Sequence, residues 1–237
     1  MSERIKKIFE KKGKKLVTFT TGGDPDFNTS LEILKTIINN GIDIIEIGMP
    51  FSDPMADGPT IQESSVRSLS NGTKINDIFE IVMNIRKFNN EIPIILVGYY
   101  NSIFNLGIDN FTAKCAETGV DGLIIVDLQP EEDSELFTKT KENGIDLIRL
   151  ITPTTDQKRL TTILSNASLP EAPLKTFALP ELIRIAETRP NFIIDLFQII
   201  GSPGVFDLVK APKISPGFSN LIKTRSSLLF FFNPPST

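Results

Sequence analysis

The 237-residue chain contains no histidine, and its one cysteine is Cys115. Without histidine, Ser-His-Asp catalysis, imidazole bases and histidine-ligated metal sites are excluded. Any acid–base chemistry must therefore come from carboxylates, lysine or tyrosine. The single cysteine excludes an intramolecular disulfide and is typical of a reducing compartment. We therefore expect a cytoplasmic location.

Long apolar runs and a strong net charge are also missing. No stretch approaches the roughly twenty apolar residues that a membrane span needs, and the N-terminal segment is polar and lysine-rich, unlike a signal peptide. The formal net charge of -4 argues against a dedicated nucleic-acid surface. We interpret the basic run at residues 11–15 as a solvated helix end. Neither a nucleic acid nor a membrane is expected as a partner.

What the chain does contain is an alternation of apolar runs, rich in Ile, Leu and Val, with segments of helical periodicity. This pattern predicts an α/β fold in which helices cover a parallel sheet. The expected strands are 16–20, 42–47, 92–97, 122–126 and 146–150, and the expected helices are 4–11, 27–40, 75–88, 109–118, 131–143 and 156–164. The turn Gly22–Pro25 lacks the spacing of a dinucleotide-binding fingerprint. The pattern therefore favours a (β/α)8 TIM barrel over a doubly wound sheet.

The composition changes after about Ser168. The last 69 residues hold nine of the 16 prolines but three of the 15 glycines, and three more βα units would need about 75 residues. A helix at 179–187, a strand at 192–200 and an apolar run at 228–232 are the patterns found there. We expect residues 1–168 to form βα units 1–5 of an incomplete barrel domain. Residues 169–237 then form a divergent Pro-rich C-terminal segment in place of units 6–8.

This abrupt change suggests a frameshifted or otherwise replaced C-terminus. The other reading frames past codon 168 test that hypothesis. A sheet of five strands that does not close would leave apolar faces and an unpaired edge exposed. Such an edge promotes aggregation unless the C-terminal segment covers it.

One acidic residue, Glu46, lies inside an expected strand that is made largely of isoleucine. Strand alternation places it on the same face as Ile44 and Gly48, the expected barrel interior. Burial there raises the pKa of a carboxyl unless the group is paired with a cation. Glu46 is therefore a candidate proton-transfer group near the C-terminal end of its strand, where barrel active sites lie. The alternative is a structural ion pair with a lysine or arginine.

Asp53 and Asp57 lie in the Pro- and Gly-rich loop that follows. Taken alone, an Asp before Pro or Gly is usually a turn residue. However, the stretch from Glu46 to Gln62, EIGMPFSDPMADGPTIQ, resembles the signature of tryptophan synthase alpha chains. Segments 19–25, 99–107 and 119–132 resemble other parts of that family, except that Gln129 stands where the family usually has proline. The resemblance is continuous from the first helix to about Ser168.

The resemblance implies retro-aldol cleavage of indole-3-glycerol phosphate to indole and glyceraldehyde 3-phosphate in tryptophan biosynthesis. Glu46 matches the main acid–base residue of the family, and Asp57 matches the carboxylate that stabilises positive charge on the indole nitrogen. The positions that match the indole pocket are Phe19, Ile61, Val97, Tyr99 and Ile124.

The same resemblance implies a partner. Family members pass indole to a β subunit in an α2β2 assembly, and that subunit carries pyridoxal phosphate. The alpha chain itself needs no cofactor and no metal. The loop with Asp53 and the stretch near Asn101 resemble the surface that faces the β subunit.

Two alternatives stay open. The family's Gly-rich phosphate-binding loops have no counterpart beyond the turns at 201–204 and 215–219, where proline removes backbone donors. The chain could therefore be a degenerate, non-catalytic alpha-like subunit that has lost phosphate binding. The other alternative is a barrel aldolase that uses a lysine Schiff base. The absence of lysine from the five expected strands argues against it.

Overall fold

The computed structural model describes residues 2–11, 15–150, 155–165 and 227–232. In chain order the elements are α1 (Glu3–Glu10), β1 (Lys15–Thr21), α2 (Phe27–Asn39), β2 (Ile44–Gly48), α3 (Pro59–Ser70), α4 (Ile75–Phe88), β3 (Ile94–Gly98), α5 (Tyr100–Leu106), α6 (Ile108–Thr118), β4 (Gly122–Ile125), α7 (Ser134–Glu142), β5 (Asp146–Leu147), α8 (Gln157–Ser165) and β6 (Ser227–Phe232). The predicted alternation of strands and helices is confirmed through α8. The helix expected at 179–187 and the strand expected at 192–200 lie outside the described residues.

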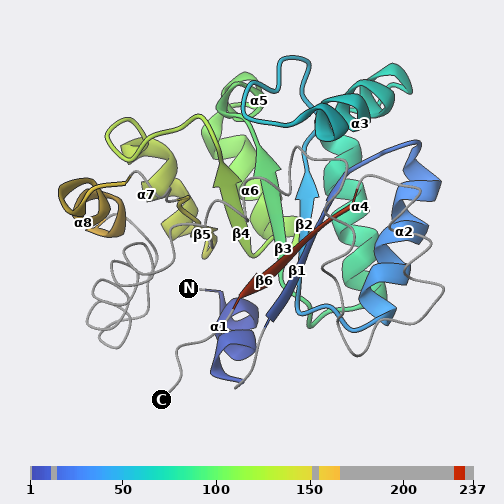
Figure 1. The fold of residues 1–237 in the computed structure, drawn as a ribbon, viewed down its shortest axis with the longest axis horizontal. Coiled ribbons are helices and arrows are strands. Elements are labelled where there is room, and N and C mark those ends of the chain that lie inside the picture. The colour runs from blue at the N-terminus through green and yellow to red at the C-terminus, as the bar shows by residue number, and fades with distance from the viewer. Residues whose placement is uncertain (1, 12–14, 151–154, 166–226, 233–237) are drawn as a thin grey trace.

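The strands form one six-stranded sheet in the order β5-β4-β3-β2-β1-β6 (Figure 1). Strands β1 to β5 run parallel and stand in sequence order, as in the wall of a barrel. On the other side of β1, strand β6 pairs antiparallel, with Lys15 opposite Phe232 and Thr20 opposite Ser227. Within the described residues the fold is thus the wall of an incomplete TIM barrel, with the five βα units that were predicted. The edge of β1, expected to be unpaired, is covered.

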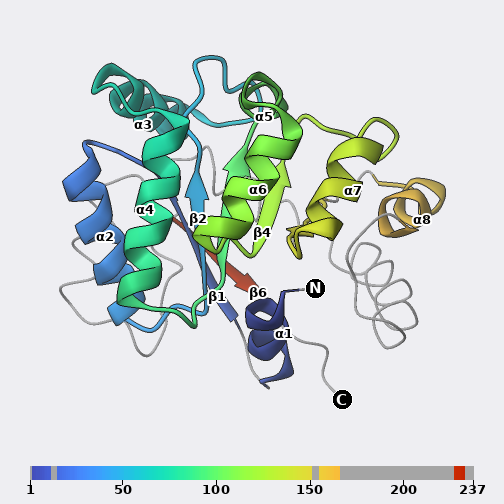
Figure 2. The ribbon, with the colours of Figure 1, turned by 180° about the vertical axis from the view of Figure 1, so that it is seen from behind.

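Helices α2, α4, α6 and α7 cover one face of the sheet (Figure 2). The main apolar core lies between these helices and the sheet, and its fully buried side chains include Ile45, Leu96, Ile81 and Phe111. Each such side chain contributes roughly 1.5–3 kcal/mol by leaving water. The opposite face of the sheet, which we call the inner face, carries a smaller apolar cluster made of Val17, Ile44, Ile95 and Ile124, with Ile8 of α1 packed against it. Among the described residues, no helix combines the length and the apolarity needed to cross a membrane.

At the N-terminal ends of the strands, α1 is tied to the sheet by a charged network around Asp121. The Asp121 carboxylate is 1% exposed and forms ion pairs with Arg86 and, at 3.1 Å, with Arg4. It also accepts the backbone N–H of Ile94 at 2.8 Å and the hydroxyl of Ser2. This carboxylate is therefore fully supplied with donors, which is the condition under which a buried charge is tolerated.

Two helices at the C-terminal ends of the strands, α3 and α5, were not predicted. The buried face of α3 consists largely of Ser64, Ser65 and Ser68, so the helix shows little of the apolar periodicity that sequence analysis detects. Its start nevertheless follows a local rule, because Pro59 occupies the first turn, where no backbone donor is needed. Helix α5 has seven residues and only Ile103 buried, which is too short for a periodic signal.

The ends of the five strands also differ from the prediction by one to three residues, and two of these differences bear on the argument. Strand β5 ends at Leu147 rather than at residue 150, because only Asp146 and Leu147 pair with β4. Strand β1 begins at Lys15, whose register partner is Phe232. The prediction that the five strands contain no lysine was therefore wrong by one residue. Lys15 lies at the N-terminal end of its strand, however, away from the end where barrel active sites are built.

Candidate active site

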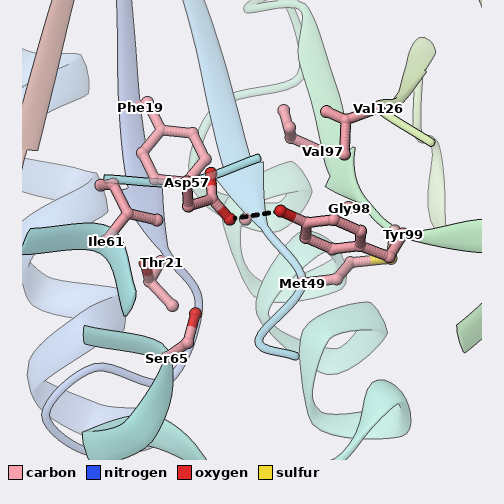
Figure 3. A pocket seen from close by; sticks show the side chains of 11 residues that line it. Phe19, Thr21, Met49, Asp57, Ile61, Ser65, Val97, Gly98, Tyr99 and Val126 are labelled. Atoms are coloured by element: carbon pink, nitrogen blue, oxygen red, sulfur yellow. Dashed lines mark hydrogen bonds between the residues drawn. The ribbon is translucent and has the colours of Figure 1, made fainter. Parts of the chain in front are cut away.

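A narrow cavity lies at the C-terminal ends of β1, β2 and β3 (Figure 3). Its lining combines strand ends, the loop before α3 and the first turns of α3: Phe19, Thr21, Gly48, Met49, Asp57, Ile61, Ser65, Val97, Gly98, Tyr99 and Val126. The cavity volume is about 20 Å³, which is room for about one water molecule. An aromatic ligand can therefore enter only if side chains or the loop before α3 move.

Glu46 is placed on the inner face by the register of the sheet. It stands between Phe19 of β1 and Ile95 of β3, and residues in register point to the same face. Gly48, two residues on, leaves room for the neighbouring ring, since a Cβ there would lie 2.5 Å from Cζ of Phe19. Glu46 therefore sits one row of side chains below the cavity, beside two residues that line it, Phe19 and Gly48.

Burial raises the pKa of Glu46 from 4.5 to about 7. The cause of this shift is desolvation, which disfavours the charged form of the carboxyl. No described residue forms a hydrogen bond or ion pair with Glu46, and its exposure is intermediate rather than nil. The structure thus gives no support to the alternative of a structural ion pair. A carboxyl with these properties can both give and take a proton near neutral pH.

Asp57 lies directly before α3, in the loop that follows β2. Its side chain is half-buried, and its Oδ2 accepts a hydrogen bond of 3.0 Å from the hydroxyl of Tyr99. Burial raises the pKa of Asp57, and the Tyr99 hydrogen bond opposes this shift because it favours the charged form. Glu46 and Asp57 are therefore two carboxyls in different environments, one without a donor and one with a donor, which suits them to different roles.

Five of the predicted site residues come together around the cavity, namely Phe19, Asp57, Ile61, Val97 and Tyr99. The other two do not line it. Glu46 lies one row below, as described above, and Ile124 packs into the inner-face apolar cluster beside Val97 and Val126. The arrangement as it stands therefore presents Asp57 to the cavity directly and Glu46 only at its floor.

Several lining residues were not predicted. Ser65 and Thr21 place hydroxyl groups at the cavity, beside its apolar side chains. Ser65 could be predicted only if α3 were predicted first. That helix was missed because its buried face consists largely of serines. Met49 and Val126 directly follow β2 and β4, so the rule that barrel sites form at the C-terminal ends of strands was the signal that could have found them.

The residues predicted to face a partner lie at the same end of the sheet, and both are exposed. Asp53 is in the loop between β2 and α3, and Asn101 is in the first turn of α5. Two large apolar side chains are exposed on the same two segments, Met55 at 79% and Phe104 at 66%.

The described residues contain no group of three or more His, Cys, Asp or Glu side chains that could hold a metal ion. The groups that the site does hold are a carboxyl with a raised pKa, Glu46, and a second carboxyl, Asp57, beside aromatic and aliphatic side chains.

Comparison with known proteins agrees with this geometry. The family model of the tryptophan synthase alpha chain matches residues 5–169. The chain is 48% identical over 169 residues to the tryptophan synthase alpha chain of Zymomonas mobilis, a match that covers 70% of this chain and 62% of that one.

Solved structures give the same result. Tryptophan synthase subunit alpha from Legionella pneumophila superposes with a TM-score of 0.68 at 37% identity, covering 71% of this chain and 65% of that one. A chain from a structure of the tryptophan synthase α2β2 complex of Pyrococcus furiosus gives 0.62 at 40% identity, covering 65% of each chain. The matched region contains the whole of the cavity. This chain therefore belongs to the tryptophan synthase alpha chain family.

Proposed function

We propose that the chain cleaves indole-3-glycerol phosphate to indole and glyceraldehyde 3-phosphate. The observation that carries this proposal is the Glu46 carboxyl, which has a pKa of about 7, no cationic partner among the described residues, and a position beside a cavity that holds a second carboxyl. Family membership supplies the substrate. The apolar lining by Phe19, Ile61 and Val97 suits a flat aromatic ring.

In the proposed reaction Glu46 handles both protons. In its neutral form it protonates the ring carbon that bears the glycerol chain. In its charged form it takes the proton from the adjacent glycerol hydroxyl as the carbon–carbon bond breaks and the aldehyde forms. The proton gained by the ring equals the proton lost by the hydroxyl, so no external acid, base or oxidant is needed. A pKa near 7 keeps both forms of Glu46 populated at neutral pH.

Asp57 is proposed to stabilise the positive charge that develops on the indole nitrogen when the ring is protonated. The charged form is needed for this role, and the Tyr99 hydrogen bond favours it. The positions of Phe19, Ile61, Val97, Tyr99 and Ile124 are proposed to enclose the indole. Of these, Ile124 requires the cavity to deepen toward the inner-face cluster.

The proposal includes a partner. The Pyrococcus furiosus structure is of an α2β2 complex, and the exposed segments with Asp53 and Asn101 are proposed to face a β subunit here. Pyridoxal phosphate is proposed to reside in that β subunit, with no cofactor or metal in this chain. A cytoplasmic location, based on the single cysteine, and the division into a barrel domain at 1–168 and a divergent segment at 169–237 belong to the same proposal.

Release of indole from indole-3-glycerol phosphate tests the proposal, with the β subunit of a relative added in a parallel series. Glu46→Gln keeps the shape of the side chain but cannot carry the proton, so turnover should fall by about 10²–10⁴-fold. Glu91→Gln, an exposed acid at the opposite end of the sheet, serves as the matched control and should keep wild-type turnover. Wild-type turnover in Glu46→Gln would overturn the assignment.

A second function is favoured by one observation, the share of a relative's length that this chain spans. The chain spans 62% of the length of the curated relative that it matches, and the described residues include no counterpart of the family's phosphate-binding loops. A non-catalytic alpha-like subunit that only docks the β subunit would fit this. The same assay separates the two functions, because that subunit would bind the β subunit tightly while wild type and Glu46→Gln both release no indole.

A further inference from the structure

The hydroxyl of Tyr99 makes two hydrogen bonds of opposite sense. It donates to Oδ2 of Asp57 at 3.0 Å and accepts the backbone N–H of Ala56 at 3.0 Å. A tyrosine hydroxyl has a single proton to donate, and the side chain is buried, with 4% exposure. The bond from Ala56 therefore leaves that proton directed at Asp57. Figure 3 shows the hydroxyl and the carboxylate facing each other across the cavity.

The ring of Tyr99 is fixed as well. Phe51 stacks on it with ring centroids 4.9 Å apart and an interplanar angle of 23°. The next backbone N–H, that of Tyr100, donates to the Asp127 carboxylate at 2.8 Å, which anchors the start of α5. Phe51 and Ala56 both belong to the loop that carries Asp57. Tyr99 thus joins the end of β3 to three residues of that loop.

The backbone of Asp57 is also held, so only its side chain remains to be oriented. Its N–H donates to the carbonyl of Pro54 at 3.1 Å, and its carbonyl accepts from Nε2 of Gln62 at 2.9 Å. Oδ1 of Asp57, in contrast, receives no hydrogen bond from any described residue. One carboxylate oxygen is therefore occupied, and the other is available to a ligand in the cavity.

We propose that Tyr99 is a positioning residue, whose hydroxyl holds Oδ2 of Asp57 so that Oδ1 receives the N–H of an indole in the cavity. This inference rests on the proposed function and deepens it. The sequence resemblance gave Tyr99 a part in lining the pocket, whereas the hydrogen bonds give it a second task that phenylalanine could not perform. The chemical group recognised is a ring N–H donor.

Ligand pairs that differ only in this group test the proposal. Indole and benzofuran have the same shape, but benzofuran has a ring oxygen in place of the N–H. Binding of each to the full chain is measured by calorimetry, in wild type and in Tyr99→Phe. A hydrogen bond to a charged acceptor should make wild type prefer indole by roughly tenfold or more. Tyr99→Phe, which keeps the stacked ring, should reduce the preference to about twofold.

Two controls separate positioning from a general structural role. Tyr100→Phe alters the neighbouring tyrosine, whose ring contacts Phe104 rather than the cavity, and should keep the wild-type preference. In an Asp57→Asn background the Tyr99→Phe change should have no further effect on the preference, because the group that Tyr99 positions is already lost. Thermal unfolding of each variant reports whether the fold is kept.

The outcomes distinguish the inference from the proposed function. An unchanged tenfold preference in Tyr99→Phe would overturn the positioning role while leaving the lyase assignment intact. Equal loss of indole and benzofuran binding in Tyr99→Phe would also overturn it, since the ring and not the hydroxyl would then matter. A wild-type chain that neither releases indole from its substrate nor binds indole would overturn the proposed function, and the positioning role with it.

Discussion

The two ends of the parallel sheet each hold a buried carboxyl, but the surroundings of the two carboxyls differ. At the N-terminal ends, Asp121 has two arginines, a backbone N–H and a hydroxyl around it. At the C-terminal ends, Glu46 has no cation or donor among the described residues, and burial raises its pKa to about 7. The surroundings of Asp121 stabilise its negative charge. The surroundings of Glu46 instead raise its pKa, so that it can exchange a proton near neutral pH.

This difference bears on stability: the contacts of Asp121 stabilise the fold, whereas burial of Glu46 without a cation or donor among the described residues destabilises it. In barrel enzymes the N-terminal face of the sheet serves the fold and the C-terminal face carries the chemistry. Local rules that favour stability are commonly broken at functional sites. At Glu46, no described residue offsets the cost of burying the carboxyl, and the cavity lies beside it. The comparison therefore predicts that replacing a carboxylate by an amide has opposite effects at the two ends.

The largest effect is expected at the N-terminal end. Asp121→Asn leaves the guanidinium of Arg86, which is 9% exposed, without its counter-charge. Breaking one partner of a buried pair costs about 3–5 kcal/mol in the free energy of unfolding. Chemical denaturation at pH 7 measures this loss. Glu117→Gln, at an exposed ion pair on α6, should change stability by less than about 0.5 kcal/mol, and a similar small change in Asp121→Asn would contradict the comparison.

The opposite sign is expected at Glu46. The folded chain holds this proton up to a pH of about 7, whereas the unfolded chain releases it near pH 4.5, so ionisation makes wild type less stable as pH rises between these values. Glu46→Gln lacks this penalty. It should match wild type below pH 4.5 and exceed its stability by up to about 3 kcal/mol above pH 7. Chemical denaturation of both proteins from pH 4 to pH 8 measures the difference in the free energy of unfolding. A difference that stays constant over this pH range would show that Glu46 is not desolvated.

A smaller effect is expected where the C-terminal end uses neutral hydrogen bonds. Ser64 of α3 shares a 2.5 Å hydrogen bond with the buried hydroxyl of Thr21. Ser64→Ala leaves that hydroxyl without its partner and should cost about 1–2 kcal/mol, with little dependence on salt. Ser70→Ala at the exposed end of the same helix is the control. A strong salt dependence of the Ser64→Ala loss would mean that charges, not hydroxyls, attach α3 to the sheet.

Sequence patterns predicted elements well where burial is apolar and regular. Helix α4 was predicted at its observed bounds, Ile75–Phe88, because Ile78, Val82 and Ile85 recur at helical spacing on its buried face. Helix α3 was missed because its buried face is made of serines, which hydrogen-bond to Thr21 and Gly22 rather than forming an apolar stripe. The pattern method detects apolar burial, not burial in general.

For the site, chain position was enough to predict that Glu46 faces inward, because strand alternation fixes the face. That no described residue forms a hydrogen bond or ion pair with Glu46 could not be predicted, since this depends on which side chains other strands bring beside it. The two hydrogen bonds of Tyr99 were likewise beyond prediction. They depend on the loop between β2 and α3 folding back onto the end of β3.

The sequence by itself determined the family and the five βα units, and it singled out Glu46 and Asp57 as candidate site residues, because these follow from local spacing and from a continuous motif. Only the tertiary structure decided that the apolar run near the C-terminus pairs antiparallel with β1, and that Glu46 lies below the cavity while Asp57 lines it. The physical reason is range. Helical and strand periodicity are set by neighbours along the chain, whereas strand partners and the solvation of a buried charge are set by residues that only folding brings together.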